Sequence, residues 1–210
     1  MKTLLIPLAA FSLLAGGLYA QAASTVDLNV NGKITPSACE PGLSNGGVYD
    51  LGKVAAKDLN VDQPTPLAAH NLQLTLTCQA LTLVAIKPRD NRQGSHFDSG
   101  NPLKFGLGLV NGNEKVGSMT LGLKSIVADG APMYGITSVG RNTWAPSDLL
   151  SPTFLTSFTH NRSIPDPAPS PVQRLTADVM IEPRIAPANT LTLTSEVPID
   201  GAATLEITYL

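Results

Sequence analysis

The sequence predicts an all-β protein built as an antiparallel sandwich or barrel. Many short segments alternate apolar and polar residues with the period of two that is typical of a half-buried strand. Turn-forming glycine, proline, asparagine and aspartate follow these segments, and no long segment has helical periodicity. Of the 210 residues, 43 % are hydrophobic and only 14 % are charged, so we expect one domain with a substantial core.

Residues 1–22 are predicted to be a secretory signal peptide. Lys2 supplies a positive charge, residues 4–18 are mostly apolar, and Ala20-Gln21-Ala22 is a small-x-small cleavage motif. A cut after Ala20 is the alternative to one after Ala22. The apolar run is too short for a membrane anchor. We therefore expect residues 23–210 to be exported, as a soluble protein or as part of an assembly outside the cytoplasm.

A series of predicted strands follows the signal peptide. Residues 26–34 begin it, with Val26, Leu28 and Val30 alternating with polar neighbours, and residues 72–78 show the most regular alternation inside the chain. The other predicted strands before the C-terminus are residues 81–86, 105–109, 119–123, 175–181 and 191–193, and the turn pairs are Asn45-Gly46, Asn111-Gly112, Asp129-Gly130 and Asp200-Gly201.

Residues 135–174 are predicted to be a long, partly irregular excursion with one or two edge strands. Their alternation is poor, and six prolines lie between Pro146 and Pro171. Residues 164–171 are expected to be extended or polyproline-like. Connections of this length are usually functional or mobile.

The C-terminal residues are predicted to form a half-buried strand with an unpaired edge. Apolar and polar side chains alternate over residues 203–209, and Gly201 precedes them. Because the sequence ends with this strand, no hairpin partner follows it, and we expect its edge to pair with another chain. The residues of its apolar side are Ala203, Leu205, Ile207 and Tyr209, and Leu210 ends the sequence.

Cys39 and Cys78 are predicted to form a disulfide. They are the only cysteines of the chain, and a pair in an oxidising export compartment is typically oxidised. The bond would join the first strand to the strand at residues 72–78. Closing a loop of about 40 residues contributes about 4 kcal/mol in the chain-entropy model.

No pattern in the sequence predicts an enzyme, a metal site or a cofactor. Residues 42–46 match the G-x-S-x-G motif of hydrolases around Ser44, but no helix is predicted after them. His70, His96 and His160 lack metal-ligand spacing, and surface histidine is favoured over a site shared by His96 and Asp98. The net charge of −2 gives no basis for expecting nucleic acid as a partner.

A sugar-binding surface is the alternative function that the aromatic residues allow. Tyr134 and Trp144 could stack on sugar rings, although a lone tryptophan in a sandwich more often belongs to the core. This alternative describes a self-complete secreted β-sandwich that binds carbohydrate through residues 134–158.

Two segments resemble the subunits of chaperone-usher fimbriae. Residues 30–39, with Gly32 seven positions before Cys39, are similar to the first strand of these subunits, and the last strand with its penultimate Tyr209 is similar to theirs. Residues 185–210 resemble more closely a family of exported fimbrial-like proteins of Gram-negative bacteria that is catalogued as a domain of unknown function. This resemblance covers nearly all of residues 23–210.

The resemblance implies an immunoglobulin-like sandwich, residues 32–210, that is incomplete and is completed by a donated strand. A periplasmic chaperone would first lend that strand, and an outer-membrane usher would then exchange it for the N-terminal extension of the next subunit. Residues 23–31 would be this extension, with Val26, Leu28 and Val30 as donor side chains. Ala203, Leu205, Ile207, Tyr209 and Leu210 would form the acceptor groove and the chaperone-binding strand.

The function implied is that of a structural subunit in a cell-surface fimbria, or pilus, that contributes to adhesion to a host or surface receptor. Head-to-tail exchange builds filaments. The extension has only nine residues before Gly32, fewer than expected for a major subunit. A major subunit, a minor or tip subunit and a self-complete domain therefore stay open at this point. The distinguishing feature is whether residues 23–31 pair with a neighbour or within their own chain.

Overall fold

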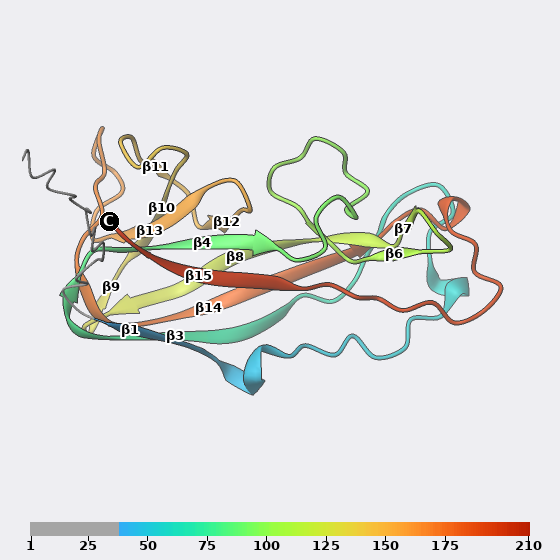
Figure 1. Ribbon diagram of the computed structural model, residues 1–210, viewed down its shortest axis with the longest axis horizontal. Helices are drawn as coiled ribbons and strands as arrows, with labels where there is room; N and C mark the ends of the chain where they lie inside the picture. The colour runs from blue at the N-terminus through green and yellow to red at the C-terminus, as the bar shows by residue number, and fades with distance from the viewer. Residues whose placement is uncertain (1–37) are drawn as a thin grey trace, which may run out of the picture. The chain divides into compact units, whose positions relative to one another are not determined.

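A computed structural model describes residues 38–210, and in this part of the chain two antiparallel β-sheets face each other without any α-helix (Figure 1). The predicted all-β antiparallel sandwich is thereby confirmed. The predicted signal peptide, the extension at residues 23–31 with Val26, Leu28 and Val30, and the predicted strand at residues 26–34 lie outside the described residues.

The first sheet of the described chain contains the three longest strands and begins at β1. Its order is β1 (Cys39–Leu43), β3 (His70–Thr82), β14 (Val172–Ile185), β8 (Gly117–Ala128) and β12 (Leu149–Leu150). Short strands extend it: β2 (Thr65–Pro66) pairs with β14, and β5 (Phe105–Gly106) and β9 (Ala131–Pro132) pair with β8.

The second sheet ends at the C-terminal strand. Its order is β11 (Ala145–Pro146), β10 (Tyr134–Ser138), β13 (Leu155–Thr159), β4 (Val84–Asp90) and β15 (Ala203–Tyr209). β6 (Leu109–Val110) and β7 (Glu114–Lys115) form a separate hairpin, and the 3₁₀ turns are η1 (Ser44–Gly47), η2 (Ala56–Asp58) and η3 (Ala188–Thr190).

The core lies between the two sheets and follows the predicted alternation. On β3, Leu72, Leu74, Leu76 and Cys78 are buried, whereas the residues between them are exposed. β4 contributes Val84 and Ile86 from the opposite sheet, and Phe105 and Phe158 are the largest fully buried side chains of the described residues. The period of two in the sequence therefore marks the buried face of β3 correctly.

The strand predicted at residues 119–123 is longer in the structure because a bulge shifts its period. Ser125 has a positive φ of 51°, and the register between β8 and β14 shifts at this point. Leu121 and Leu123 are buried before the bulge, and Ile126 and Ala128 are buried after it. The extra residue moves the buried set from odd to even positions, so alternation alone predicts only the first part.

Residues 135–174 are more regular than the sequence predicts. β13 lies between β10 and β4, so it is an inner strand of its sheet (Figure 1). All five of its residues are buried, and its hydroxyl groups bond to backbone: Ser157 Oγ donates to the Val84 carbonyl at 2.6 Å and Thr156 Oγ1 to the Leu149 carbonyl at 3.1 Å. A strand buried on both faces with satisfied hydroxyls shows no alternation of polarity.

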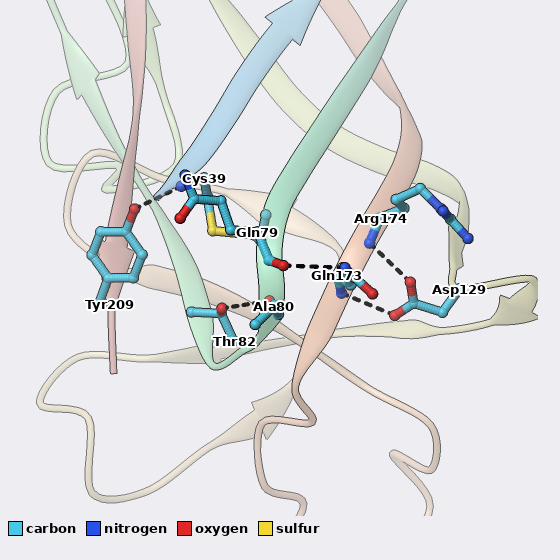
Figure 2. Close-up of a disulfide and its surroundings, with 9 residues drawn as sticks. Cys39, Gln79, Ala80, Thr82, Asp129, Gln173, Arg174 and Tyr209 are labelled. Carbon is cyan, nitrogen blue, oxygen red and sulfur yellow. Dashed lines mark hydrogen bonds between the residues drawn. A yellow bond between two sulfur atoms is a disulfide. The ribbon is translucent and has the colours of Figure 1, made fainter. Parts of the chain in front are cut away.

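The predicted disulfide between Cys39 and Cys78 is confirmed and joins β1 to β3 (Figure 2). The two residues lie directly opposite each other in the register, with 4.0 Å between their Cα atoms. The predicted turns at Asn45-Gly46, Asn111-Gly112 and Asp129-Gly130 have left-handed backbones, as these residue pairs favour. In Figure 2 the Asp129 carboxylate accepts hydrogen bonds from the N–H groups of Gln173 and Arg174.

Candidate functional site

The C-terminal strand β15 has one edge that no strand within residues 38–210 covers. On its other side it pairs with β4, and next to this pairing the Ala202 carbonyl accepts from the Asn91 N–H and the Leu210 N–H donates to the Leu83 carbonyl. Because backbone groups alternate sides along a strand, the N–H and C=O groups of Ala203, Leu205, Ile207 and Tyr209 point toward the open edge. Such groups are a template for pairing with another strand.

The inward side chains of β15 are less buried than those of the other long strands. Leu72, Leu74 and Leu76 on β3 are 2–4 % exposed, whereas Ala203, Leu205, Ile207 and Tyr209 are all only half-buried. All four nevertheless pack against the hydrophobic core. These side chains lie next to the edge that no strand within residues 38–210 covers, and a strand added there would bury them further.

β1, the edge strand of the first sheet, lies across from this edge. The Ala38 carbonyl accepts a hydrogen bond from the Gln79 N–H of β3, so Cys39, Pro41 and Leu43 direct their backbone groups away from β3. The Cys39 N–H donates to the Tyr209 hydroxyl at 2.9 Å, as Figure 2 shows. β1 and β15 are thus tied together at this end of the sandwich. We call the interval between β1 and β15, with its continuation toward residues 48–55 and 191–202, the open side.

Beyond this tie, the open side widens into an apolar cavity of about 1000 Å³. One wall is residues 47–56, the other is residues 193–203 with Leu205, and the floor is the inner face of the first sheet, including Leu121 and Val179. Apolar side chains dominate all three surfaces, and no charged group lies on the floor. A cavity of this kind suits an apolar side chain or a series of them.

The wall at residues 191–202 has the sequence of a strand but no strand partner. Half-buried Leu191, Leu193, Val197 and Ile199 alternate with exposed residues and continue the pattern of β15. The sequence predicts a strand at residues 191–193, and this prediction is wrong: η3 ends at Thr190, and residues 191–193 belong to no strand. The alternation marks a buried face correctly, but strand assignment also needs a hydrogen-bonded neighbour, which residues 38–210 do not supply here.

Hydrogen bonds hold this wall from its outer side. The Glu114 carboxylate accepts from the N–H and the Oγ1–H of Thr192, both at 2.7 Å, and the Asp200 N–H donates to the Leu107 carbonyl at 3.0 Å. Arg92 donates two hydrogen bonds to the Asp200 carboxylate, at 2.8 and 2.9 Å. These bonds and this ion pair hold the pKa of Asp200 below its ordinary value. The backbone contacts fall on even-numbered residues, so the odd-numbered ones face the cavity.

Acid is expected to loosen this wall through Glu114. The hydrogen bonds from Asn111 and Thr192 lower the pKa of Glu114 below its ordinary value of 4.5. A lowered pKa means that the stabilisation is fully present above pH 4.5 and is lost as the pH falls through the folded-state pKa. We expect the exchange protection of the Thr192 amide, corrected for intrinsic pH dependence, to fall on acidification. Glu114→Gln should lower it at pH 7 and remove this dependence, and an unchanged protection in the variant would contradict the assignment.

The opposite wall, residues 48–55, is held mainly by side chains. The Tyr49 ring stacks on His70 with 4.3 Å between ring centroids, and its hydroxyl donates to the Ala68 carbonyl. Leu51 and Val54 are half-buried and line the cavity. At the mouth, Lys53 Nζ lies 2.8 Å from Glu196 Oε1 of the other wall, and both side chains are almost fully exposed.

The structure brings together only part of the predicted acceptor residues. Ala203 and Leu205 line the cavity, whereas Ile207 and Tyr209 lie where β1 and β15 are tied, and Leu210 donates its N–H to the Leu83 carbonyl. The sequence did not predict that the two walls outside the strands, residues 48–55 and 191–202, belong to the site. The alternation over residues 191–199 was a usable signal for one of them, and residues 48–55 carry no comparable pattern.

Comparison with known proteins gives one family match, which covers the first part of the chain. A family model described as "Protein of unknown function (DUF1120)" matches residues 28–104. The match includes both cysteines, β3 and β4 but not the wall at residues 191–202 or β15.

The chain is similar to two proteins of Escherichia coli (strain K12). It is 25 % identical to the uncharacterized protein YhcF over 234 residues, which cover 94 % of this chain and 98 % of YhcF. It is 30 % identical to the protein GltF over 136 residues, which cover 55 % of this chain and 54 % of GltF. The similarity to YhcF therefore extends over nearly the whole of both chains.

The residues of the G-x-S-x-G motif take a different geometry from a nucleophile elbow. Gly42 and Leu43 belong to β1, and Ser44 begins the turn η1, which extended chain follows. Ser44 Oγ accepts a hydrogen bond from the Gln73 N–H at 2.8 Å. The serine therefore fastens the end of β1 to β3.

His96 and Asp98 do not share a site. His96 lines a separate cavity of about 210 Å³, whereas the Asp98 carboxylate accepts a hydrogen bond from Ser118 Oγ at 2.9 Å. Within residues 38–210, no group of three or more His, Cys, Asp or Glu side chains is placed to hold a metal ion. The described part of the chain also contains no helix of the length and hydrophobicity needed to cross a bilayer.

Tyr134 and Trp144 do not line either of these two cavities. Tyr134 is exposed, and the guanidinium of Arg162, which is paired with Asp148, lies 5.0 Å from its ring centroid. Trp144 is half-buried, and its indole N–H donates to the Arg141 carbonyl. One face of Tyr134 is therefore already covered by a cation, which leaves less ring surface for a sugar.

Proposed function

We propose that this protein is an exported structural subunit of a fimbria, or pilus, which polymerises by donor-strand exchange and contributes to surface adhesion. The observation that carries the proposal is the edge of β15 that no strand within residues 38–210 covers, beside an apolar cavity of about 1000 Å³. An edge strand with unpaired backbone groups and half-buried apolar side chains binds an extended peptide by β-strand addition. The confirmed disulfide is consistent with an oxidising compartment outside the cytoplasm.

The donor in this proposal is residues 23–31 of a neighbouring subunit. Val26, Leu28 and Val30 alternate with polar residues, so one face of an extended donor is apolar and fits the cavity. Main-chain hydrogen bonds to β15 supply affinity, and the three side chains set the register. Because donor and acceptor are different surfaces, each subunit binds the next one head-to-tail and a filament results.

The same edge requires protection before assembly. A long apolar edge that is exposed in solution pairs with other chains and aggregates. A periplasmic chaperone that lends a strand to β15, and an outer-membrane usher at which that strand is exchanged, are therefore the proposed partners. Adhesion would add a receptor on a host or other surface.

Removing the donor is expected to abolish polymers. The full chain and a variant lacking residues 23–31 are produced in a periplasm, and their assembly is compared by sedimentation and by resistance to hot detergent. We expect polymers only from the full chain, because the variant keeps the acceptor but offers no strand. A synthetic peptide of residues 23–31 should stabilise the variant against unfolding.

A matched pair of variants tests whether polymers require the apolar side chains of the donor, and not only the presence of residues 23–31. Replacing Val26, Leu28 and Val30 by serine should prevent polymers, whereas replacing Asp27 and Asn29 by serine should leave them intact. If full chain and deletion variant are equally stable monomers, donor-strand exchange is wrong for this protein. The self-complete carbohydrate-binding module would then be the better account.

A further inference from the structure

We infer that a donated strand is seated on only one half of the open side, between residues 48–55 and residues 193–205, and that the occupant is residues 23–31 of a second copy. This inference rests on the proposed function and adds to it the place where the strand binds. We call this part the open half. The closed half is formed by the start of β1, at Cys39, and residues 207–209.

The closed half is already filled by the side chain of Tyr209. Its hydroxyl accepts the hydrogen bond from the Cys39 N–H at 2.9 Å, and Figure 2 shows the ring between β15 and Cys39. Cys39, Ile207 and Tyr209 also pack against the hydrophobic core. A strand inserted here would have to break this bond and expel the ring.

In the open half, the two walls are separated by the cavity. β1 ends at Leu43, and the left-handed backbones of Asn45 (φ 53°) and Gly46 (φ 60°) turn the chain before it forms the wall at residues 48–55. Val54 on this wall and Val197 on the other are both half-buried and line the cavity. An extended chain between the walls would cover the sides of both.

The wall at residues 193–205 presents backbone groups that a strand can use. The contacts of Thr192, Asp200 and Ala202 all lie on its outer side, toward Glu114, Leu107 and Asn91. By the alternation of an extended chain, the N–H and C=O groups of residues 197, 199, 201, 203 and 205 point into the open half. Among residues 38–210, hydrogen bonds from an added strand to these groups would replace none of the backbone contacts of Thr192, Asp200 and Ala202.

The length of the donor matches this wall. Nine extended residues span about 30 Å, and residues 197–205 are also nine residues. The inward positions of this wall are Val197, Ile199, Gly201, Ala203 and Leu205, so its centre is occupied by the two smallest residues. In the register that places Leu28, the largest donor side chain, opposite Gly201 and Ala203, this side chain packs over Leu107 and Met119, which fill the space at Gly201. A donor with only three apolar side chains is then long enough.

The position of the N-terminal end favours a second copy as the source. Ala38, to which the extension is connected through residues 32–37, bonds to Gln79 at the closed half, and β1 runs from there toward the open half. The described chain therefore begins at the closed half, and the cavity lies toward the other end of β1. Subunits joined in this way are linked head-to-tail.

The first test maps where a donor binds. The acceptor is residues 23–210 with Val26, Leu28 and Val30 replaced by serine, so that its own extension cannot compete. The probe is the unsubstituted peptide of residues 23–31 with a photoreactive analogue of leucine at position 28. We expect crosslinks to residues 48–55 and 193–205. Crosslinks mainly to residues 207–209 or to Cys39 would show that the strand does not bind at the open half, and would leave donor-strand exchange in place.

The second test uses two matched substitutions in the same acceptor. Val197 and Ile207 are both half-buried, inward-facing and on the same extended segment, ten residues apart. Val197→Ser should weaken peptide binding by about tenfold, and Ile207→Ser should change it by less than about twofold while lowering the stability of the acceptor. A larger loss of peptide binding for Ile207→Ser than for Val197→Ser would show that the strand does not bind at the open half. A peptide that binds nowhere, with no polymers from the unsubstituted chain, would overturn the proposed function as well.

Discussion

Replacing Phe158 with alanine is expected to lower the free energy of unfolding by about 4 kcal/mol, because a fully buried phenylalanine leaves a cavity that close-packed surroundings do not refill. Phe158 is fully buried on β13, which lies between β10 and β4. The measurement is urea denaturation of the variant and the unsubstituted protein at pH 7. A loss of this size would place residues 135–174 in the core of the sandwich.

Phe154 is the matched control for this substitution. It lies four residues earlier, is half-buried and precedes β13. Phe154→Ala removes the same atoms from a partly solvated position, so the loss should be no more than about 1 kcal/mol. Equal losses for the two variants would contradict the inner position of β13.

Replacing both Cys39 and Cys78 with serine is expected to cost about 4 kcal/mol of stability, from the entropy that the unfolded chain regains when a loop of this length is opened. The cysteines are 39 residues apart in sequence and face each other across β1 and β3. β1 is an edge strand of only five residues, and in the first sheet it pairs only with β3 among the described strands. Denaturant titration of purified periplasmic protein measures the effect.

The disulfide also supports the closed half of the open side. The Cys39 N–H holds the Tyr209 hydroxyl, so release of β1 should free Tyr209 as well. The unsubstituted protein in the presence of a thiol reductant should reproduce the stability of the double variant, and the variant itself should not respond to reductant. A loss below about 1 kcal/mol would show that β1 is held by its pairing alone and would contradict the entropic account.

Strands with one polar and one apolar face could be predicted from the sequence with good accuracy. β3, β14 and β15 coincide with predicted segments because their buried side chains recur at every second residue. β8 was predicted only up to its bulge, because one left-handed residue at Ser125 reverses the alternation. β13 was not predicted, because its threonine and serine side chains are buried and bonded to backbone carbonyls.

The candidate site could be predicted in its location but not in its extent. The sequence indicated an uncovered edge on residues 203–209, and the structure leaves that edge without a strand partner in residues 38–210. The cavity, however, lies beside Ala203, Leu205 and the preceding residues, not beside Ile207 and Tyr209. The hydrogen bond between Cys39 and Tyr209 closes that end, and it joins residues 170 positions apart, which no local pattern reveals.

The all-β class, the pairing of Cys39 with Cys78 and most of the residues that the long strands bury follow from local sequence patterns. Alternation and cysteine count act through local geometry and chemistry, so they can be read along the chain. Only the tertiary structure decided that β13 is an inner strand, that residues 48–55 and 193–205 enclose a cavity, and that Tyr209 closes one end of the open side. These features depend on which distant segments approach one another, and periodicity reports the burial of a face but not the neighbour that buries it.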